Sequence, residues 1–183
     1  TRSALAPVRR RIQPVFQDPY ETISPRQRVR DFVAEGLVVG GRLDAAQREA
    51  AVLTALEAVG LAPAREVADR YAHELSGGQR QRVVIAGALV LEPDLIVADE
   101  PVSMLDVSIR VQIVDLLLEL RRTRDVAFLF ITHDLSLAWA VADRIAVLYL
   151  GRIVEIGPAA TVIGAPVHPY TRALVSAAPT PGR

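Results

Sequence analysis

The stretch LIVADE, Leu95 to Glu100, places four consecutive apolar residues directly before two carboxylates. A short apolar run of this kind is typical of a strand that is buried on both faces in a parallel sheet. Three more such runs follow, at Val126 to Ile131, Ile145 to Leu150 and Ile153 to Ile156. We therefore predict four buried strands, arranged as in a parallel sheet.

Helical patterns separate the first three of these runs, and such alternation favours a layered α/β core. The longest pattern is DVSIRVQIVDLLLELRR, for which Asp106 is the predicted N-cap. Val107, Val111, Val114 and Leu118 fall on one side of this helix and are predicted to form its apolar face.

The first half of the chain has helical periodicity and one predicted strand, Ile12 to Phe16. The predicted helices are Pro25 to Val39, Asp44 to Leu61 and Ser76 to Leu91, and Gly60 is a suitable stop for the second of them. This order predicts a helical lobe that is inserted between an early strand and the rest of the sheet.

The end of the chain, after Gly157, is rich in proline and small residues. It predicts a short helix around Tyr170 to Ala177, followed by a loose end. The chain opens at Thr1 rather than at a methionine, in a segment that resembles the middle of a longer protein. We therefore expect a fragment or a processed piece.

Composition limits the possible classes of function. The 183 residues are 51% apolar and 23% charged with a net charge of zero, as in a soluble globular protein of one domain or of a core with a smaller lobe. The balance of charges argues against an electrostatic nucleic-acid binder. The absence of cysteine excludes disulfides and thiolate metal sites. No apolar run is long enough for a membrane span, so a membrane connection would require a partner.

Two acids, Asp99 and Glu100, follow the first buried run. The carboxyl edge of a parallel sheet is where α/β proteins bind ligands. In nucleotide hydrolases one such acid holds Mg²⁺ through water, and a second can polarise the attacking water. The alternative is that both acids merely cap the turn at Pro101.

Two further polar positions also follow predicted strands. His133 comes after the second buried run and can hydrogen-bond a phosphate or an attacking water, or it can be incidental to a helix that Asp134 caps. Gln17 follows the early strand, and its amide oxygen can bond a metal-bound water. It can equally be a surface residue before the turn at Asp18 and Pro19.

The stretch LSGGQRQR, Leu75 to Arg82, puts a hydroxyl and two glycines at the start of a predicted helix. The first N–H groups of a helix attract anions, Ser76 can cap the helix, and glycines allow close approach by a phosphate. Gln79 and Arg82 add donors near the same end. The alternative is a capped helix whose glycines fill a tight turn, although a glycine pair would weaken the first turn without need.

Taken together, these segments resemble the ATPase subunit of ATP-binding cassette transporters. The matching motifs occur in family order: VFQDP (the glutamine loop), LSGGQRQR (the signature), LIVADEP (the Walker B strand), SMLD at Ser103 to Asp106 (the D-loop) and ITHD (the switch histidine). Within the family, RRRIQPVFQDPY, ADEPVSMLDVSIRVQIVDLL and the tail HPYTRALVSAAP resemble the oligopeptide and dipeptide importer branch. We interpret the HPYT motif as a family marker rather than as a catalytic site.

The resemblance implies an α/β, P-loop NTPase-like (RecA-like) layered core with a helical signature lobe, from which the N-terminal part of the core is missing. The implied segments are the end of the N-terminal core with the glutamine loop (1–19), the helical lobe (20–90), the Walker B and switch-histidine part of the core (91–157) and the tail (158–183).

The resemblance also implies ATP and Mg²⁺ as cofactors and two ATPase domains that close head to tail. Asp99 would position Mg²⁺, Glu100 would polarise the attacking water, and His133 would contact the γ-phosphate. Gln17 would sense metal and water and couple the helical lobe to the permease, while Asp106 would communicate between the two sites.

In the same scheme, Ser76, Gly77, Gly78 and Gln79 would meet the ATP of the partner. The implied partners are permease subunits, a second ATPase subunit in a homo- or heterodimer and, indirectly, an extracytoplasmic solute-binding protein, with no nucleic acid. The implied location is peripheral, on the cytoplasmic face of the cell membrane.

Three features depart from the family pattern. The phosphate loop and the adenine-stacking aromatic are absent from this sequence, which leaves nothing to grip the β- and γ-phosphates in the same chain. Gly87 stands where relatives usually have arginine, and it should weaken the signature helix by up to about 1 kcal/mol relative to alanine. Met104 replaces a usual alanine, and methionine adapts to irregular packing.

Two other functional classes remain as alternatives. The chain can be a non-catalytic module that supplies a signature half-site to a complete partner. A chromosome-maintenance or DNA-repair ATPase is disfavoured, because the sequence has neither long heptad repeats nor zinc-binding cysteines.

Overall fold

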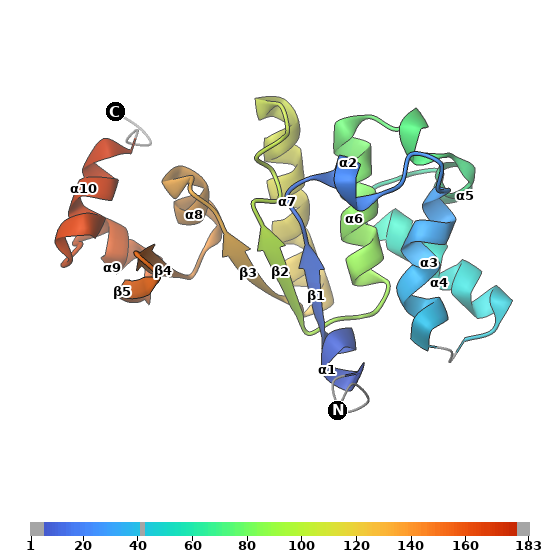
Figure 1. Ribbon diagram of the computed structural model, residues 1–183, viewed down its shortest axis with the longest axis horizontal. Helices are drawn as coiled ribbons and strands as arrows, with labels where there is room; N and C mark the ends of the chain where they lie inside the picture. Colours follow the sequence, from blue (N-terminus) through green and yellow to red (C-terminus); the bar gives the residue numbers. More distant parts are fainter. Residues whose placement is uncertain (1–5, 41–42, 179–183) are drawn as a thin grey trace. The chain divides into compact units, whose positions relative to one another are not determined.

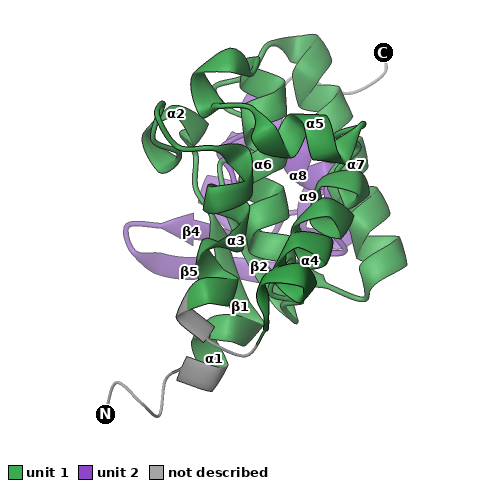
Figure 2. Cartoon of the chain, turned by 90° about the vertical axis from the view of Figure 1, so that its right-hand side faces the viewer, with its two compact units in different colours: residues 1–131 green, residues 132–183 purple. Residues whose placement is uncertain are grey.

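The computed structural model describes residues 6–40 and 43–178. The chain forms two compact units, residues 1–131 and residues 132–183, which are drawn in different colours in Figure 2. Each unit is described by itself. No helix in the described residues has the length and hydropathy needed to cross a membrane.

The elements of both units are labelled in Figure 1. The first unit contains α1 (Ala6–Arg11), β1 (Ile12–Val15), α2 (Pro19–Thr22), α3 (Val29–Gly40), α4 (Ala45–Ala58), α5 (Ala64–Asp69), the 3-10 helix η2 (Ala72–Glu74), α6 (Gly77–Leu89), β2 (Leu95–Asp99), α7 (Val107–Arg124) and β3 (Ala127–Ile131). The second unit contains α8 (Leu135–Val141), β4 (Arg144–Tyr149), β5 (Arg152–Pro158), α9 (Ala159–Gly164) and α10 (Pro169–Ala177).

In the described part of the first unit, β1, β2 and β3 form a parallel sheet in that order. Val15 pairs with Ala98, and Asp99 pairs with Ile131, so the carboxyl ends of the three strands lie at one edge. Helices α2 to α6 lie between β1 and β2 in the sequence and form a lobe beside the sheet (Figure 1). The predicted insertion of a helical lobe is therefore confirmed.

The prediction of four buried parallel strands is wrong for the last two runs. In the second unit, β4 and β5 pair antiparallel, with Leu148 opposite Ile153. Their side chains are 64% and 60% exposed, so this face of the hairpin is open. The reason is that Leu150 and Gly151, with φ angles of +47° and +75°, form a tight turn that is too short for a parallel crossover.

Strand β3 also differs from the prediction of full burial. Leu129 and Ile131 are 53% and 48% exposed, and the burial along the strand alternates. An apolar run without polar alternation predicts a strand, but it does not establish that both faces are covered.

The apolar face predicted for α7 is wrong for its first turns. Val107 and Val111 are 76% and 56% exposed, and Val114 and Leu118 are half-buried. The helix instead buries the stripe Ile113, Leu116, Leu117 and Leu120. Both sets have helical spacing, because the helix is rich in apolar residues on two sides, and packing against the rest of the unit selects one of them.

One of the predicted lobe helices, α4, is well defined at both of its ends. Asp44 caps α4 through the N–H of Gln47 at 2.8 Å, and the Gln47 side chain accepts the N–H of Asp44 in return. Gly60 has a φ of +71°, and Leu61 donates to the carbonyl of Leu56 at 3.0 Å, as in a Schellman motif. The predicted stop at Gly60 is therefore confirmed.

Helix α3 begins four residues later than predicted. The N–H of Val29 donates to the carbonyl of Arg70 at 3.0 Å, and Arg28 forms a bridge with Tyr71. The residues from Pro25 to Arg28 are thus engaged with a distant segment and do not form a helical turn. Helix α5 and the 3-10 helix η2 were not predicted.

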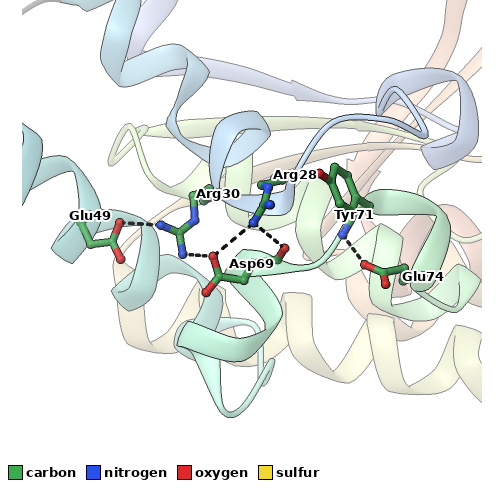
Figure 3. A network of polar contacts seen from close by, with 6 residues as sticks. All are labelled: Arg28, Arg30, Glu49, Asp69, Tyr71 and Glu74. Carbon is green, nitrogen blue, oxygen red and sulfur yellow. Dashed lines mark hydrogen bonds and ion pairs between the residues drawn. The ribbon is translucent and has the colours of Figure 1, made fainter.

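A polar network connects the helices of the lobe (Figure 3). Arg30 of α3 forms ion pairs with Glu49 of α4 and with Asp69 of α5. Arg28 is also paired with Asp69, and its guanidinium carbon lies 5.0 Å from the ring centroid of Tyr71. These contacts hold the segment that leads into α6 against the start of α3.

The second unit has its own small core, formed by Ile145, Val147, Ala159 and Val162. Helix α10 confirms the short helix predicted around Tyr170 to Ala177, whereas α9 was not predicted. His168 caps α10 by accepting the N–H of Tyr170 at 3.2 Å. The predicted loose end lies mostly outside the described residues, since the description stops at residue 178.

The HPYT segment is anchored by a carboxylate of β5. Glu155 accepts the N–H of Val167 at 2.9 Å and that of His168 at 3.0 Å. The N–H of Val167, followed by further donors that include the N–H of His168, lowers the pKa of Glu155 below its ordinary value of 4.5. The rings of Tyr149 and Tyr170 stack with centroids 4.2 Å apart. These contacts give the motif a structural role.

Candidate functional site

Three of the predicted site residues in the first unit follow strand ends at one edge of the sheet. Gln17 lies two residues after β1, and both Asp99, the last residue of β2, and Gln17 are exposed. Glu100 follows Asp99 directly and is half-buried. Because β1 and β2 are adjacent and in register, the sheet brings Gln17 to the same edge as the two acids.

The backbone at Glu100 has an unusual conformation. Its φ angle is +45°, and its N–H still donates to the carbonyl of Ile131 at 2.9 Å. A left-handed conformation is unfavourable for a residue with a β-carbon, and such positions concentrate at functional sites. Asp125 and Leu150 also have positive φ, at a helix end and in a hairpin turn, so at Glu100 this conformation marks a sharp turn directly after β2.

The predicted N-cap Asp106 lies directly before α7, as expected, but its side chain makes no capping hydrogen bond. The preceding residues follow Glu100 in two tight turns. Ser103 donates its N–H and its hydroxyl to the carbonyl of Glu100, at 3.2 and 3.1 Å, and Leu105 donates to the carbonyl of Val102. The exposed carboxylate of Asp106 therefore lies at the end of an ordered loop that begins at Glu100.

The start of α6 presents hydrogen-bond donors. Ser76 accepts the N–H of Gln79 at 3.3 Å, and the amide oxygen of Gln79 accepts the N–H of Ser76 at 3.0 Å. In this capping box the side chains of Ser76 and Gln79 each act as an acceptor. The Ser76 hydroxyl proton and the Gln79 amide protons can therefore be donated to a ligand. The N–H groups of Gly77 and Gly78, in the first turn, have no intrahelical acceptor. This arrangement suits an anion such as phosphate.

The glycine pair has a packing role of its own. A β-carbon at Gly78 would lie 2.7 Å from Cγ2 of Ile109 in α7, and one at Gly77 would lie 3.2 Å from the hydroxyl of Tyr20. Close approach of α6 and α7 thus requires a glycine at position 78, and the expectation that the glycine pair has no structural need is wrong for Gly78. The donors that suit a phosphate are the N–H groups of the first turn, not the space beside the α-carbon of Gly78.

Gly87, the departure from the family pattern, lies against an aromatic ring. A β-carbon at this position would be 2.9 Å from Cε1 of Phe32 in α3. The ring thus fills the space that a larger side chain would need. Met104, the other substitution, is 58% exposed, which agrees with a mild effect.

His133 and Asp134 belong to the second unit. Asp134 is the N-cap of α8, since its carboxylate accepts the N–H groups of Ser136 at 2.9 Å and Leu137 at 3.1 Å. The hydroxyl of Thr132 accepts the N–H of Asp134 at 3.0 Å. His133 is exposed, between these two anchored residues. Its contact with a γ-phosphate stays a prediction.

Sequence reasoning missed Tyr20, which lies beside the signature. Asp18 caps the short helix α2 by accepting the N–H of Tyr20 at 2.7 Å, and Pro19 occupies its first position. The order Asp-Pro-Tyr is itself a helix-start signal that could have predicted this turn. The contact of Tyr20 with α6 is a tertiary feature without a sequence signal.

The donor set at the sheet edge suits Mg²⁺ with a nucleotide. Mg²⁺ is usually held by one or two carboxylates together with phosphate oxygens and water, and here Asp99 and the amide oxygen of Gln17 are exposed oxygen donors. The described residues contain no cluster of three or more histidine, aspartate or glutamate side chains that could hold a metal by itself. The donors thus fit a metal that arrives with phosphate groups.

Comparison with family models gives two matches. The model described as ABC transporter matches residues 1–103, and the model described as oligopeptide/dipeptide transporter, C-terminal region, matches residues 154–183. The first match includes Gln17, the signature and the two acids, and the second includes the HPYT segment.

Individual relatives agree with these matches. A glutathione import ATP-binding protein of Shigella boydii is 53% identical over 175 residues, which are 96% of this chain and 28% of the relative. A Brucella ovis protein provisionally named as a peptide import ATP-binding protein is 52% identical over 173 residues, or 94% of this chain and 54% of the relative. The chain thus spans about half, or less, of the length of these relatives.

A solved structure agrees as well. The cbiO1 protein of Clostridium perfringens, part of the ABC transporter complex cbiONQ, is 30% identical, with a TM-score of 0.79 over 90% of this chain and 64% of that chain. The similarity to known ABC transporter proteins therefore extends to the fold.

Proposed function

The chain belongs to the ABC transporter family, and we propose that it is part of a subunit that binds and hydrolyses ATP to energise import of oligopeptides or dipeptides. The observation that carries this proposal is the common sheet edge that holds Gln17, Asp99 and the strained Glu100. The donor-rich start of α6 supports it independently, because it suits the phosphate of a nucleotide.

Each predicted site residue has a proposed role. Asp99 positions Mg²⁺, which neutralises phosphate charge when it is bound, and Glu100 polarises the attacking water. Gln17 senses the metal and water, and His133 contacts the γ-phosphate. Asp106 communicates between two sites of a dimer.

The signature residues act on the nucleotide of a second subunit. Ser76, Gly77, Gly78 and Gln79 donate to the γ-phosphate of an ATP whose other contacts come from the partner. This arrangement is proposed from the resemblance of LSGGQRQR, Leu75 to Arg82, to the family signature.

The proposed solute is a peptide. The similarity of residues 154–183 to the oligopeptide/dipeptide transporter C-terminal region and the names of the two relatives support this class. We propose that the complete protein lies peripherally on the cytoplasmic face of the cell membrane, with permease subunits, a second ATPase subunit and, indirectly, an extracytoplasmic solute-binding protein as partners.

The proposal is tested first by the ATPase activity of the chain. The purified 183 residues should show no steady ATP hydrolysis, because neither copy in a homodimer supplies a phosphate loop. Activity that the Glu100→Gln variant abolishes would contradict this expectation. The coding sequence upstream of Thr1 gives a second test, since a GxxxxGK[ST] motif there is expected if the chain is part of a complete ATPase.

A second candidate function is that of a non-catalytic module that lends its signature to a complete partner. The donors at the start of α6, which suit a phosphate, are the feature that such a module would supply. ATP-dependent association of the Glu100→Gln chain with an ABC ATPase that contains a phosphate loop is expected in this case. Failure to associate in the presence of ATP would exclude a role in trans.

A further inference from the structure

Tyr20 contacts the first turn of α6 at two points. The guanidinium carbon of Arg80 lies 4.3 Å from the ring centroid of Tyr20, and a β-carbon at Gly77 would lie 3.2 Å from its hydroxyl oxygen. Helix α2, which carries Tyr20, lies beside the start of α6 in Figure 1. The ring therefore bridges two residues of the signature segment.

Arg80 extends this contact to the residues before α6. Its Nε donates to the carbonyl of Leu75 at 3.2 Å, and its backbone N–H donates to the carbonyl of Ser76 at 2.9 Å. The guanidinium thus lies between the Tyr20 ring and the residue that precedes the cap. A displacement of the ring would act on Leu75, Gly77 and Arg80 together.

On its other side, Tyr20 is fixed to the segment that follows Gln17. The carboxylate of Asp18 accepts the N–H of Tyr20 at 2.7 Å, and the hydroxyl of Thr22 donates to the carbonyl of Asp18 at 2.7 Å. Pro19 is buried and restricts the backbone between them. The backbone of Tyr20 is therefore anchored to the residues directly after Gln17.

Burial does not account for an aromatic residue at this position. Tyr20 is 52% exposed, and cation–π contacts at exposed sites are weak. The residue thus adds little to the core of the lobe, whereas its two contacts define where α6 begins relative to the residues after Gln17.

We propose that Tyr20 is a positioning residue that transmits movement of the segment after Gln17 to the signature residues Leu75 to Gln79 of the same chain. Its importance for ATP turnover rests on the proposed function. The mechanical coupling between the two segments does not, and it can be measured in the chain without nucleotide or partner.

The experiment uses Asp18→Ala as the disturbance and the amide NMR signals of Gly77, Gly78 and Gln79 as the readout. Asp18→Ala removes the cap of α2 and is expected to shift these three signals in the otherwise unchanged chain. In a Tyr20→Leu background, Asp18→Ala should leave the three amide signals in place. Tyr20→Phe, which keeps the ring under Arg80, should preserve most of the response, and Arg80→Gln should remove it.

The control is Tyr71→Leu, which removes a different cation–π pair of the lobe, that with Arg28, but leaves the Tyr20 contact. This background should retain the response to Asp18→Ala. Equal responses in the Tyr20→Leu, Arg80→Gln and unchanged chains would overturn the proposal, as would loss of the response in Tyr71→Leu alone. If the Tyr20→Leu chain fails to fold, the Arg80→Gln background replaces it in the test, because it removes the guanidinium that lies over the Tyr20 ring.

Discussion

The backbone N–H of Glu100 donates to the carbonyl of Ile131 at 2.9 Å while the φ angle of Glu100 is +45°. The pairing between β2 and β3 therefore continues one residue beyond the strand, and the chain turns sharply at the carboxylate that we propose for catalysis. A left-handed conformation costs a residue with a β-carbon roughly 1–2 kcal/mol. The direction of the Glu100 side chain is thus set by the backbone.

This strain predicts different stabilities for two variants that both remove the carboxylate. Glu100→Gly should have a free energy of unfolding higher than that of Glu100→Ala by about 1 kcal/mol, because glycine adopts positive φ without a steric penalty. Urea denaturation measures the difference. At Asp99, a strand residue, the alanine variant should instead be more stable than the glycine variant. Equal free energies of unfolding for the two variants at Glu100 would contradict the strain.

The contact between Gly78 and Ile109 predicts that a methyl group here is harmful. Gly78→Ala should lower the free energy of unfolding by about 1–3 kcal/mol, because the new β-carbon would lie 2.7 Å from Cγ2 of Ile109. In an Ile109→Ala background the same change should cost much less. Gly164→Ala is the control, since a β-carbon at this helical glycine meets nothing within 4 Å. A Gly78→Ala chain as stable as the Gly164→Ala chain would disprove the close packing.

The contact between Gly87 and Phe32 predicts that Gly87→Ala has opposite effects on stability in the unchanged chain and in a Phe32→Ala background. In the unchanged chain, Gly87→Ala should be destabilising, because its β-carbon would lie 2.9 Å from the Phe32 ring. In a Phe32→Ala background it should be stabilising by about 1 kcal/mol, the ordinary gain of alanine over glycine in a helix. Thermal unfolding of the unchanged chain, the two single variants and the double variant gives the coupling energy between the two positions. Additive effects would show that the ring does not oppose a side chain at this position.

The hydrogen bonds to Glu155 predict a pH dependence in the second unit. Donation from the N–H of Val167, followed by further donors, lowers the pKa of this carboxyl below 4.5 in the folded chain. Its contribution to stability is therefore complete above the unfolded pKa and is lost as the pH falls through the lower folded pKa.

NMR titration of the Val167 and His168 amides measures this loss. Their signals should move together in acid as Glu155 takes up a proton, and the corresponding steps should be absent from Glu155→Gln. Amide signals that titrate in the same way in both chains would show that another group is responsible.

Several local features could be predicted from the sequence. The strand at Leu95, the caps of Ser76 and Asp134, and the Gly60 stop depend on residues only a few positions apart in the chain. Side chains cap neighbouring N–H groups in any fold that contains the helix. For the candidate site, the apolar run before Asp99 and Glu100 was sufficient to predict that these two acids end a strand of a parallel sheet, whereas the pairing of β1 with β2 in the fold places Gln17 at the same edge.

Tertiary structure decided the features that depend on distant residues. Two sides of α7 have helical spacing, and packing buries Ile113 and Leu117 but not Val107. The strain at Glu100, the neighbours of Gly78 and the position of Tyr20 under Arg80 each join elements that are far apart in the sequence. The sequence by itself thus determined the strand at Leu95 and caps such as those of Ser76 and Asp134, because these depend on local interactions. The fold decided which faces meet, because close packing is a property of surfaces that only the folded chain brings together.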